Sequence, residues 1–308
     1  MATALRIGTR DSQLAVWQAT LVKDQLAEIG VPSELVYIKS EGDIDLVTPL
    51  YALGVQGVFT KTLDAALLSN RIDIAVHSMK DVPTQLAQGI CQAAVLKRAS
   101  YRDIFVYKND ASFLDNPGSV ATIATSSVRR IAQWLHRYPN HKVEDIRGNV
   151  NTRLRKVQEN DWHGAIFAAA GLERINLRPP RSVDLDWMLP APAQGAIMIV
   201  CREGDRFAYD ACHASNDPVT ALCTRIERDF LRTLMGGCST PISALAVMDH
   251  AQIVFRGNLC SPDGATSLPI EKAVAISEAN SLGVIAAQEL LQQPSARKLV
   301  QEIHHARN

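Results

Sequence analysis

One dense cluster of side chains capable of chemistry occurs in the segment "AVHSMKDVP" (75–83). Lys80 and Asp81 are adjacent, and they come shortly after an apolar stretch that is typical of a buried strand. A carboxylate beside an ammonium can act as an acid, a base or a stabiliser of a cation. His77 has no second His or Cys at ligand spacing nearby, so the segment does not indicate a metal site. A polar loop that starts a helix is the alternative interpretation.

A second reactive group is the thiol of Cys238 in "LRTLMGGCSTPIS" (231–243). Two glycines before it and a Ser-Thr-Pro turn after it would leave room for a bulky group at the sulfur. A thiolate is a soft nucleophile that captures carbon electrophiles well. For a cysteine taken at random in this chain, a small buried hydrophobic residue is the simpler interpretation.

Arginines recur at predicted strand-to-helix turns, in "ATSSVRRIAQW" (124–134), "DIRGNVNTRLRK" (145–156) and "AAAGLERI" (168–175). A helix start offers free N–H groups and a favourable dipole to an anion, and guanidinium groups suit carboxylates and phosphates. A capped helix with solvated arginines would explain any one turn. Three in succession, with Arg10 and Ser12 after the first predicted strand, indicate a ligand with several negative groups.

Composition narrows the class of protein. The chain has 308 residues, 47% of them hydrophobic, and 32 basic side chains balance 32 acidic ones. A net charge of zero argues against nucleic acid or an anionic membrane as the partner. No apolar run is long enough for a signal peptide or a membrane span, so we expect a cytoplasmic protein. The six cysteines are widely spaced without a C-x-x-C pair, which suggests neither zinc nor a redox dithiol.

Hydrophobic periodicity predicts the elements that position these residues. Short apolar runs alternate with amphipathic helices over the first 200 residues, which predicts an α/β fold with a parallel or mixed sheet. From about residue 216 a long helix is followed by three strands (242–248, 251–258 and 268–275) and by two helices (about 278–292 and 295–306), which predicts a small α+β domain. The Pro-rich segment 189–202 is expected to carry the chain from the second domain back to the first.

Taken together, these segments resemble the porphobilinogen deaminase (hydroxymethylbilane synthase) family. The resemblance rests on motifs that occur in the family's order over nearly the whole chain: "RIGTRDSQLA", "DIAVHSMKDVP", "TSSVRR", "IRGNVNTRL", "AAGLERI", "LPAPAQGAI" and "GGCSTPI". It implies two periplasmic-binding-protein-like α/β domains that flank a cleft, and a smaller C-terminal α+β domain. We expect their bounds at 1–98 with 197–214, at 102–192 and at 216–308.

The resemblance also implies the reaction. The family joins four porphobilinogen molecules head to tail with release of ammonia, and hydrolysis frees linear hydroxymethylbilane. The cofactor is a dipyrromethane made from substrate and attached through a thioether to the cysteine of the "GGC" turn, here Cys238. Loss of ammonia from an aminomethylpyrrole leaves an electrophilic azafulvene, and the catalytic carboxylate that stabilises this cationic character is matched by Asp81.

Each pyrrole ring carries an acetate and a propionate, which accounts for the many arginines. The residues expected to bind the cofactor besides Cys238 are Ser78, Lys80, Thr125, Ser126, Arg129, Arg130 and Arg147. Those expected to bind substrate are Arg10, Ser12, Arg153, Arg174 and Gln194. No metal is expected, and the resemblance favours a monomer.

Two departures from the family pattern stand out. The loop "TPLYALGVQGVF" (48–59) has Ala52 and Gln56 where many relatives carry lysines, and Ala193 replaces a common glycine. The main alternative function is a non-catalytic two-lobed protein that clamps a polycarboxylate anion. A nucleic-acid binder is disfavoured because no aromatic stacking platform accompanies the arginines.

Overall fold

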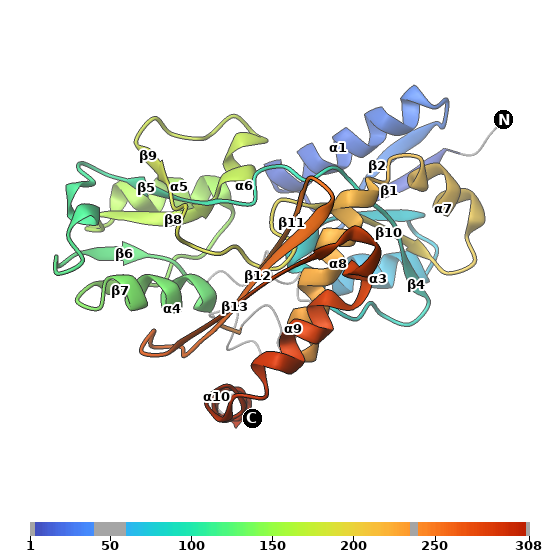
Figure 1. Cartoon of the computed structure of the whole chain (residues 1–308). Coiled ribbons are helices and arrows are strands. Elements are labelled where there is room, and N and C mark those ends of the chain that lie inside the picture. Colours follow the sequence, from blue (N-terminus) through green and yellow to red (C-terminus); the bar gives the residue numbers. More distant parts are fainter. Residues whose placement is uncertain (1–3, 40–59, 235–239, 306–308) are drawn as a thin grey trace. The chain divides into compact units, whose positions relative to one another are not determined.

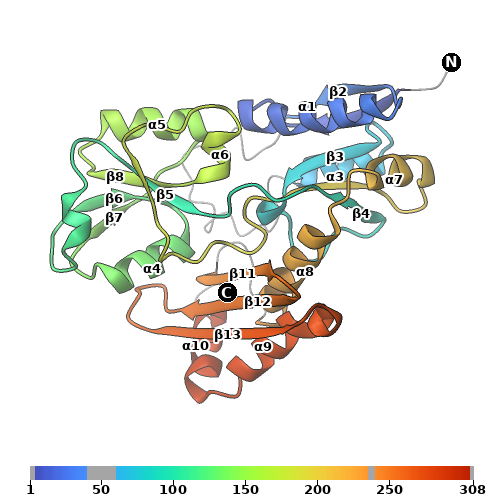
Figure 2. The same cartoon turned by 45° about the horizontal axis from the view of Figure 1, so that its top comes forward.

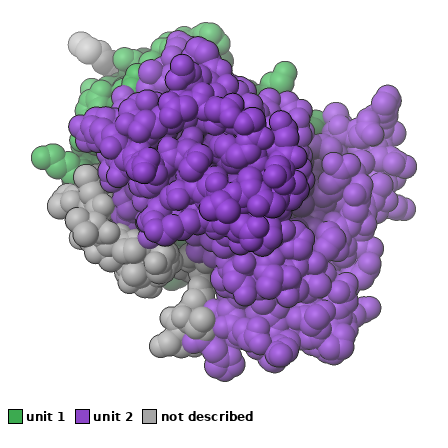
Figure 3. All heavy atoms as spheres, turned by 90° about the vertical axis from the view of Figure 1, so that its left-hand side faces the viewer, with its two compact units in different colours: residues 1–46, 55–99, 195–222 green, residues 47–54, 100–194, 223–308 purple. Residues whose placement is uncertain are grey.

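The computed structural model describes residues 4–39, 60–234 and 240–305, and it divides the chain into two compact units. Unit 1 comprises Met1–Leu46, Val55–Ala99 and Gly195–Leu222, and unit 2 comprises Val47–Gly54, Ser100–Gln194 and Cys223–Asn308 (Figure 3). The described elements include three sheets, of five, five and three strands (Figure 1). Both larger sheets mix parallel and antiparallel pairs, so the α/β prediction is confirmed.

The sheet of unit 1 has the strand order β2-β1-β3-β10-β4. Its strands are β1 (Leu5–Thr9), β2 (Ser33–Tyr37), β3 (Ile74–Ser78), β4 (Ile90–Val95) and β10 (Ile197–Arg202), and its helices are α1 (Gln13–Glu28), α3 (Lys61–Leu68) and α7 (Arg206–His213). β1 runs parallel to β2 and β3, whereas β10 is antiparallel to both β3 and β4. Apolar residues of the strands and of α1 and α7 form one buried cluster.

The larger sheet of unit 2 has the order β7-β6-β8-β5-β9. Its strands are β5 (Asp103–Tyr107), β6 (Thr122–Ala124), β7 (Lys142–Glu144), β8 (Gly164–Ala168) and β9 (Ser182–Asp184), and its helices are α4 (Val128–Arg137), α5 (Val150–Glu159) and α6 (Ala169–Glu173). β6 is parallel to β7 and β8, while β5 is antiparallel to β8 and β9. Phe105, Trp134 and Tyr138 are fully buried in its core.

The C-terminal part of unit 2 is the expected small α+β arrangement. Helix α8 (Pro218–Thr233) precedes a meander of β11 (Ile242–Asp249), β12 (Gln252–Cys260) and β13 (Ser267–Ala275), and the 3-10 helix η3 (Ile276–Ser281), α9 (Leu282–Leu290) and α10 (Pro294–His305) follow (Figure 2). Gly283 allows α9 to approach α8 closely, because a Cβ there would lie 2.0 Å from the Ile226 carbonyl oxygen.

A buried carboxylate fastens this part to the Pro-rich segment. Glu227 of α8 is fully buried, and its two oxygens accept hydrogen bonds from the backbone N–H groups of Ala193 at 2.6 Å and of Ala246 at 2.7 Å. Gln133 of α4 also donates to Ser243 of β11 at 2.9 Å. These bonds explain why segments 100–194 and 223–308 form one compact unit.

The periodicity misplaced some elements. It predicted no strand at Ile90–Val95, although β4 completes the sheet of unit 1 there, and it predicted one helix over 278–292, where η3 and α9 follow each other. No helix in the described ranges is long and apolar enough to span a bilayer.

Within unit 1, Asp73 holds three strands together at one end. Its carboxylate accepts hydrogen bonds from the Arg6 guanidinium of β1 at 2.8 and 2.9 Å and from Arg202 of β10 at 3.0 Å, just before β3 begins. Burial alone would raise the pKa of Asp73, but these hydrogen bonds outweigh it and lower the pKa to about 2. The ionised carboxylate therefore stabilises the sheet.

Asp73→Asn should lower the free energy of unfolding by about 1–2 kcal/mol at pH 7. Because the folded-state pKa lies below the ordinary value, the stabilisation is fully present above about pH 4 and is lost as the pH falls toward 2. Urea titrations at several pH values should show the gap between wild type and variant closing over that range. Asp24→Asn, at an exposed site on α1, is the control and should leave stability nearly unchanged. A gap that stays constant from pH 7 to 2 would refute this role.

Candidate active site

In unit 1 the predicted chemical residues lie at one edge of the sheet. Because β1 and β3 are parallel, their carboxyl ends place Arg10 at the same edge as Ser78 and the 3-10 helix η1 (Met79–Asp81). Met79 is buried, and its N–H donates to the Ala196 carbonyl at 3.0 Å, which fixes this turn to β10. The side chain of Asp81 is exposed, so the carboxylate is accessible to a ligand.

The two serines of this edge already have protein partners. Ser78 Oγ exchanges hydrogen bonds with the amide of buried Gln18, at 2.9 Å from Nε2 and 3.3 Å from Oε1. Ser12 is the N-cap of α1, and its hydroxyl accepts from the Ala15 N–H at 3.4 Å. Both hydroxyls therefore form hydrogen bonds within the protein that hold the turns at this edge in place.

His77 stays neutral beneath this edge. It is 7% exposed, and burial, together with the charge of Arg10, lowers its pKa to about 4. No described group forms a hydrogen bond with its Nε2 atom. A histidine with this pKa carries no extra proton at neutral pH, so His77 adds no charge to this edge, where Arg10, Lys80 and Asp81 lie.

In unit 2 the three arginine-bearing turns lie at one edge. β7, β6 and β8 are mutually parallel neighbours, so the turns that follow them meet at their carboxyl ends. Residues Thr125–Arg130 follow β6, residues 145–153 follow β7, and residues 169–174 follow β8. The sheet thus brings together the predicted residues that the sequence separates, namely Thr125, Ser126, Arg129, Arg130, Arg147, Arg153 and Arg174.

A buried aspartate organises the first of these turns. Asp103 begins the antiparallel strand β5 opposite Ala168, the last residue of β8, and is therefore at the same edge. It is fully buried, and its oxygens lie 2.7 Å from Arg129 Nη1 and 2.7 Å from Arg130 Nη2. Burial alone would raise the pKa of Asp103, but the two guanidinium charges hold it well below its ordinary value.

Arg129 and Arg130 differ in which of their guanidinium nitrogens have hydrogen-bond partners. Arg130 uses Nε and Nη2 on Asp103 and donates from Nη1 to the Ile166 carbonyl at 3.0 Å. Arg129 Nη1 donates to the Leu189 carbonyl at 2.7 Å, but its Nε is buried and lacks a hydrogen-bond partner. Two guanidinium groups against one carboxylate leave a surplus of one positive charge in the interior. An anion would compensate this surplus.

The second turn is tied to the first. Ser126 Oγ donates to the Ile146 carbonyl at 2.8 Å and accepts from the Ile146 N–H at 2.9 Å, which places buried Arg147 beside the start of α4. Arg153 Nε donates to the Gly148 carbonyl at 2.8 Å, and Gly148 has a φ of +112° that favours glycine. The turn thus holds the Arg153 side chain directly and fixes the backbone next to Arg147.

Two further predicted residues have different surroundings. Arg174 ends α6, and burial lowers its pKa to about 10 despite the opposing charge of Glu173. Gln194 is fully buried and donates to Asp103 at 2.9 Å and to the Tyr101 carbonyl at 2.8 Å. The preceding Ala193 has a φ of +63°, which explains why glycine suits this position.

Some predictions lie outside the described residues. Cys238 and its two glycines belong to segment 235–239, and the 48–59 loop belongs to segment 40–59. Among the described residues, no group of three His, Cys, Asp or Glu side chains could hold a metal ion.

The donor set of unit 2 fits a group with several carboxylates. Guanidinium groups gather at the start of α4, where the N-cap residue Ser127 makes no side-chain hydrogen bond to the first turn. The uncapped helix start, the unpartnered Arg129 Nε and the surplus positive charge all favour an anion. A dipyrromethane that bears acetate and propionate groups has this chemistry.

The sequence reasoning did not identify Asp103, whose carboxylate joins Arg129, Arg130 and Gln194. An acidic residue at the start of the apolar run "DIFVY" was the available signal, because a charge beside a buried strand needs a partner. Glu227 in α8 was missed as well, because it stands in the charged run "RIERD", which gives no local sign of burial. Its partners include backbone N–H groups from other segments.

Comparisons with known proteins identify the family of this chain. Residues 5–210 match the family model "Porphobilinogen deaminase, dipyromethane cofactor binding domain", and residues 221–292 match "Porphobilinogen deaminase, C-terminal domain". The porphobilinogen deaminase of Syntrophotalea carbinolica is 40% identical over 97% of this chain and 96% of its own length. That of Acidithiobacillus ferrooxidans is 40% identical over 99% of this chain and its own full length. The chloroplastic porphobilinogen deaminase of Oryza sativa subsp. japonica is 46% identical over 85% of this chain and 75% of its own length. The chain belongs to the porphobilinogen deaminase family.

Proposed function

We propose that this chain performs the family's reaction with Asp81 as the catalytic carboxylate and with arginines of both strand edges as carboxylate binders. The chain is a transferase that condenses four porphobilinogen molecules into hydroxymethylbilane on a dipyrromethane primer. Its family membership over nearly the full length favours this activity over a non-catalytic anion-binding protein.

The assignment of the binding residues rests on the charge of one buried cluster. The buried cluster of Arg129, Arg130 and Asp103 has a net positive charge, and it lies where three parallel strands end. A buried unpaired charge is costly, so the cluster is expected to be stable when a carboxylate lies beside it. Each pyrrole unit of the primer and substrate supplies two such carboxylates.

The arginines divide by role. Arg129 Nε has no protein partner within the described part of the chain and is proposed to donate to a ligand. Arg130, which was expected to bind the cofactor, donates to Asp103 and the β8 backbone instead, so we propose it as a positioning residue. We propose that Arg147 binds primer carboxylates together with Arg129, because Ser126 ties the two turns. Arg10, Arg153 and Arg174 are proposed as substrate binders.

We propose that the polar residues near these arginines orient other side chains, because their own hydrogen bonds are to protein groups. Ser78, Ser12 and Gln194 bond to Gln18, to the α1 backbone and to Asp103, and so orient the groups that touch ligand. Thr125 extends the pairing with β7 through its N–H, which donates to the Glu144 carbonyl at 2.9 Å. The backbone N–H groups in the first turn of α4 are suited to donate hydrogen bonds to an anion.

In unit 1, Asp81 is proposed to hold pyrrole N–H groups and to move the proton of each condensation. Its exposed carboxylate follows Lys80, and the neutral His77 below cannot supply a proton at pH 7. Dipyrromethane, held through the Cys238 sulfur, supplies the carbon nucleophile to which the chain of rings is added.

The remaining assignments come from the sequence. We propose three domains, at 1–98 with 197–214, at 102–192 and at 216–308, as well as a cytoplasmic location and a monomeric state. The antiparallel position of β10 in the sheet of unit 1 supports the return of the chain to the first domain.

Asp81→Ala should reduce kcat by about 10²–10⁴-fold while the melting temperature stays near that of the wild type, because the side chain is exposed. Porphobilinogen consumption and circular dichroism would measure both. Asp115→Ala is a matched control, since Asp115 also ends a short 3-10 helix, η2 (Ser112–Asp115), at an exposed position. Turnover within a few-fold of normal in Asp81→Ala would show that another group is the acid.

The intact mass of the purified protein should exceed its sequence mass by one dipyrromethane, and peptide mapping should find the adduct on Cys238. Cys238→Ser should have its sequence mass and no turnover, since a neutral serine hydroxyl is a poor substitute for a soft thiolate. An active preparation with an unmodified Cys238 would contradict the covalent assignment.

Arg130→Lys and Arg153→Lys should have different effects, because Arg130 is proposed to position its neighbours and Arg153 to bind substrate. Loss of the forked contact to Asp103 should cost Arg130→Lys about 2 kcal/mol of unfolding free energy. Arg153→Lys should keep its melting temperature but accumulate enzyme-bound intermediates, because a single elongation step loses a carboxylate binder. Native mass spectrometry and thermal melts would test both. Equal destabilisation with no stalled intermediates would overturn the division of roles.

A further inference from the structure

Two cysteines that are 110 positions apart in the sequence meet inside unit 1. β4 and β10 pair antiparallel, and Cys91 stands directly opposite Cys201 in their register. The two sulfur atoms lie 3.6 Å apart. The wide spacing of the cysteines had not suggested a dithiol, because the pair is created only by the strand pairing.

The backbone geometry suits a bond between the two sulfurs. Residues directly opposite each other in an antiparallel pair have Cβ atoms about 4.5–5.5 Å apart, which overlaps the longest Cβ separations found in disulfides. From 3.6 Å, the sulfurs need to approach by about 1.5 Å to reach bonding distance. The register shifts between Ile199 and Val200, one residue before Cys201. Such an irregularity lets the strand adjust locally.

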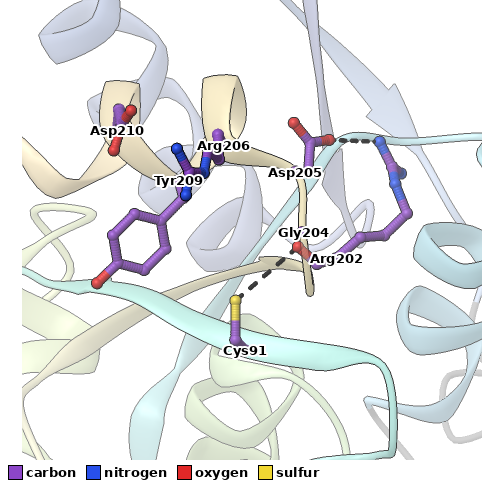
Figure 4. A pocket seen from close by; sticks show the side chains of 7 residues that line it. All are labelled: Cys91, Arg202, Gly204, Asp205, Arg206, Tyr209 and Asp210. Carbon is purple, nitrogen blue, oxygen red and sulfur yellow. Dashed lines mark hydrogen bonds and ion pairs between the residues drawn. The ribbon is translucent and has the colours of Figure 1, made fainter.

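One of the two thiols is open to small molecules. Cys91 is partly exposed and lines a cavity of about 370 Å³ at the start of α7, with Arg202, Asp205, Arg206 and Tyr209 among the other lining residues (Figure 4). Its sulfur points toward the Arg202 backbone carbonyl oxygen, 3.9 Å away. Cys201 is fully buried behind it.

Burial makes the thiols of Cys201 and Cys212 hard to ionise. Burial, with a further contribution from Cys91, raises the pKa of the Cys201 thiol far above its ordinary value. Burial and the charge of Asp205 raise the pKa of Cys212, in the same apolar cluster, to about 12. Both buried thiols stay protonated at neutral pH, so an oxidant from solvent meets Cys91 first.

We propose that Cys91 and Cys201 form a peroxide-sensitive oxidation site that closes to a reversible disulfide between β4 and β10. Cys91 sulfur attacks a peroxide oxygen, the O–O bond breaks, and Cys91 sulfenic acid and one water form from hydrogen peroxide. Cys201 sulfur then attacks Cys91 sulfur, and the hydroxyl leaves with the Cys201 proton as a second water. The two thiols lose two electrons, and the peroxide gains them.

The bond would close a large ring. β4 leads to the point where the chain leaves unit 1 at Ala99, and β10 follows its return at Gly195. The ring therefore contains the whole of segment 100–194. A crosslink across so long a loop restricts the unfolded chain strongly, so oxidation should raise thermal stability.

The test uses the holoenzyme treated with hydrogen peroxide, quenched with iodoacetamide and digested without reductant. We expect a linked peptide pair that contains Cys91 and Cys201, faster migration on a non-reducing gel, and a rise in melting temperature of about 5 °C or more. Dithiothreitol should reverse all three changes.

Cys91→Ser and Cys201→Ser should each abolish the linked peptide, whereas Cys212→Ser, the matched control from the same cluster, should retain it. The proposal is overturned if Cys91 proceeds to sulfinic acid, if it links to Cys212, or if both thiols are still alkylated after peroxide treatment. Activity is not the readout, so failure of this proposal is distinguishable from failure of the assigned reaction.

Discussion

The buried carboxylate of Asp103 is the interaction on which the candidate binding edge depends. It receives Arg129, Arg130 and Gln194 in an interior from which water is excluded, and its own strand is antiparallel to the neighbours. That reversed direction matters, because it brings the first residue of β5 to the edge where the other strands end. Guanidinium groups can stand inside the fold here only because a charge of opposite sign was buried with them.

The Asp103 cluster is suited to bind an anion because the single carboxylate neutralises only part of the charge of its two arginines. A matched set of charges would be a structural salt bridge, with no electrostatic reason to accept a ligand. Two guanidinium groups on one carboxylate keep the side chains ordered and leave a positive potential at the helix start. Glu227 provides a contrast, since its carboxylate bonds to backbone N–H groups of Ala193 and Ala246 and fastens distant segments together.

The two larger sheets share one arrangement but place different kinds of side chain on it. In each, neighbouring parallel strands end at a shared edge, and the turns after them carry the polar residues. Unit 1 places the exposed Asp81 beside Lys80 above a neutral histidine, whereas unit 2 collects guanidinium groups. The same sheet of unit 1 brings Cys91 to Cys201, at the opposite end of β3 from Ser78 and Asp81.

The sequence by itself determined the fold class, the arginine-bearing turns, and the segments around Asp81 and Cys238. Alternating apolar runs and turn residues are local signals, and the family motifs are short and contiguous. Only the tertiary structure decided that Arg129 Nε has no partner among the described residues, that β4 exists as a strand, and that Asp103 and Glu227 are buried. Each of these depends on at least one partner far away in the chain, such as Arg130, 27 positions from Asp103, or Ala193, 34 positions from Glu227. Strand pairing and burial join such residues, and no local pattern records which distant groups will meet.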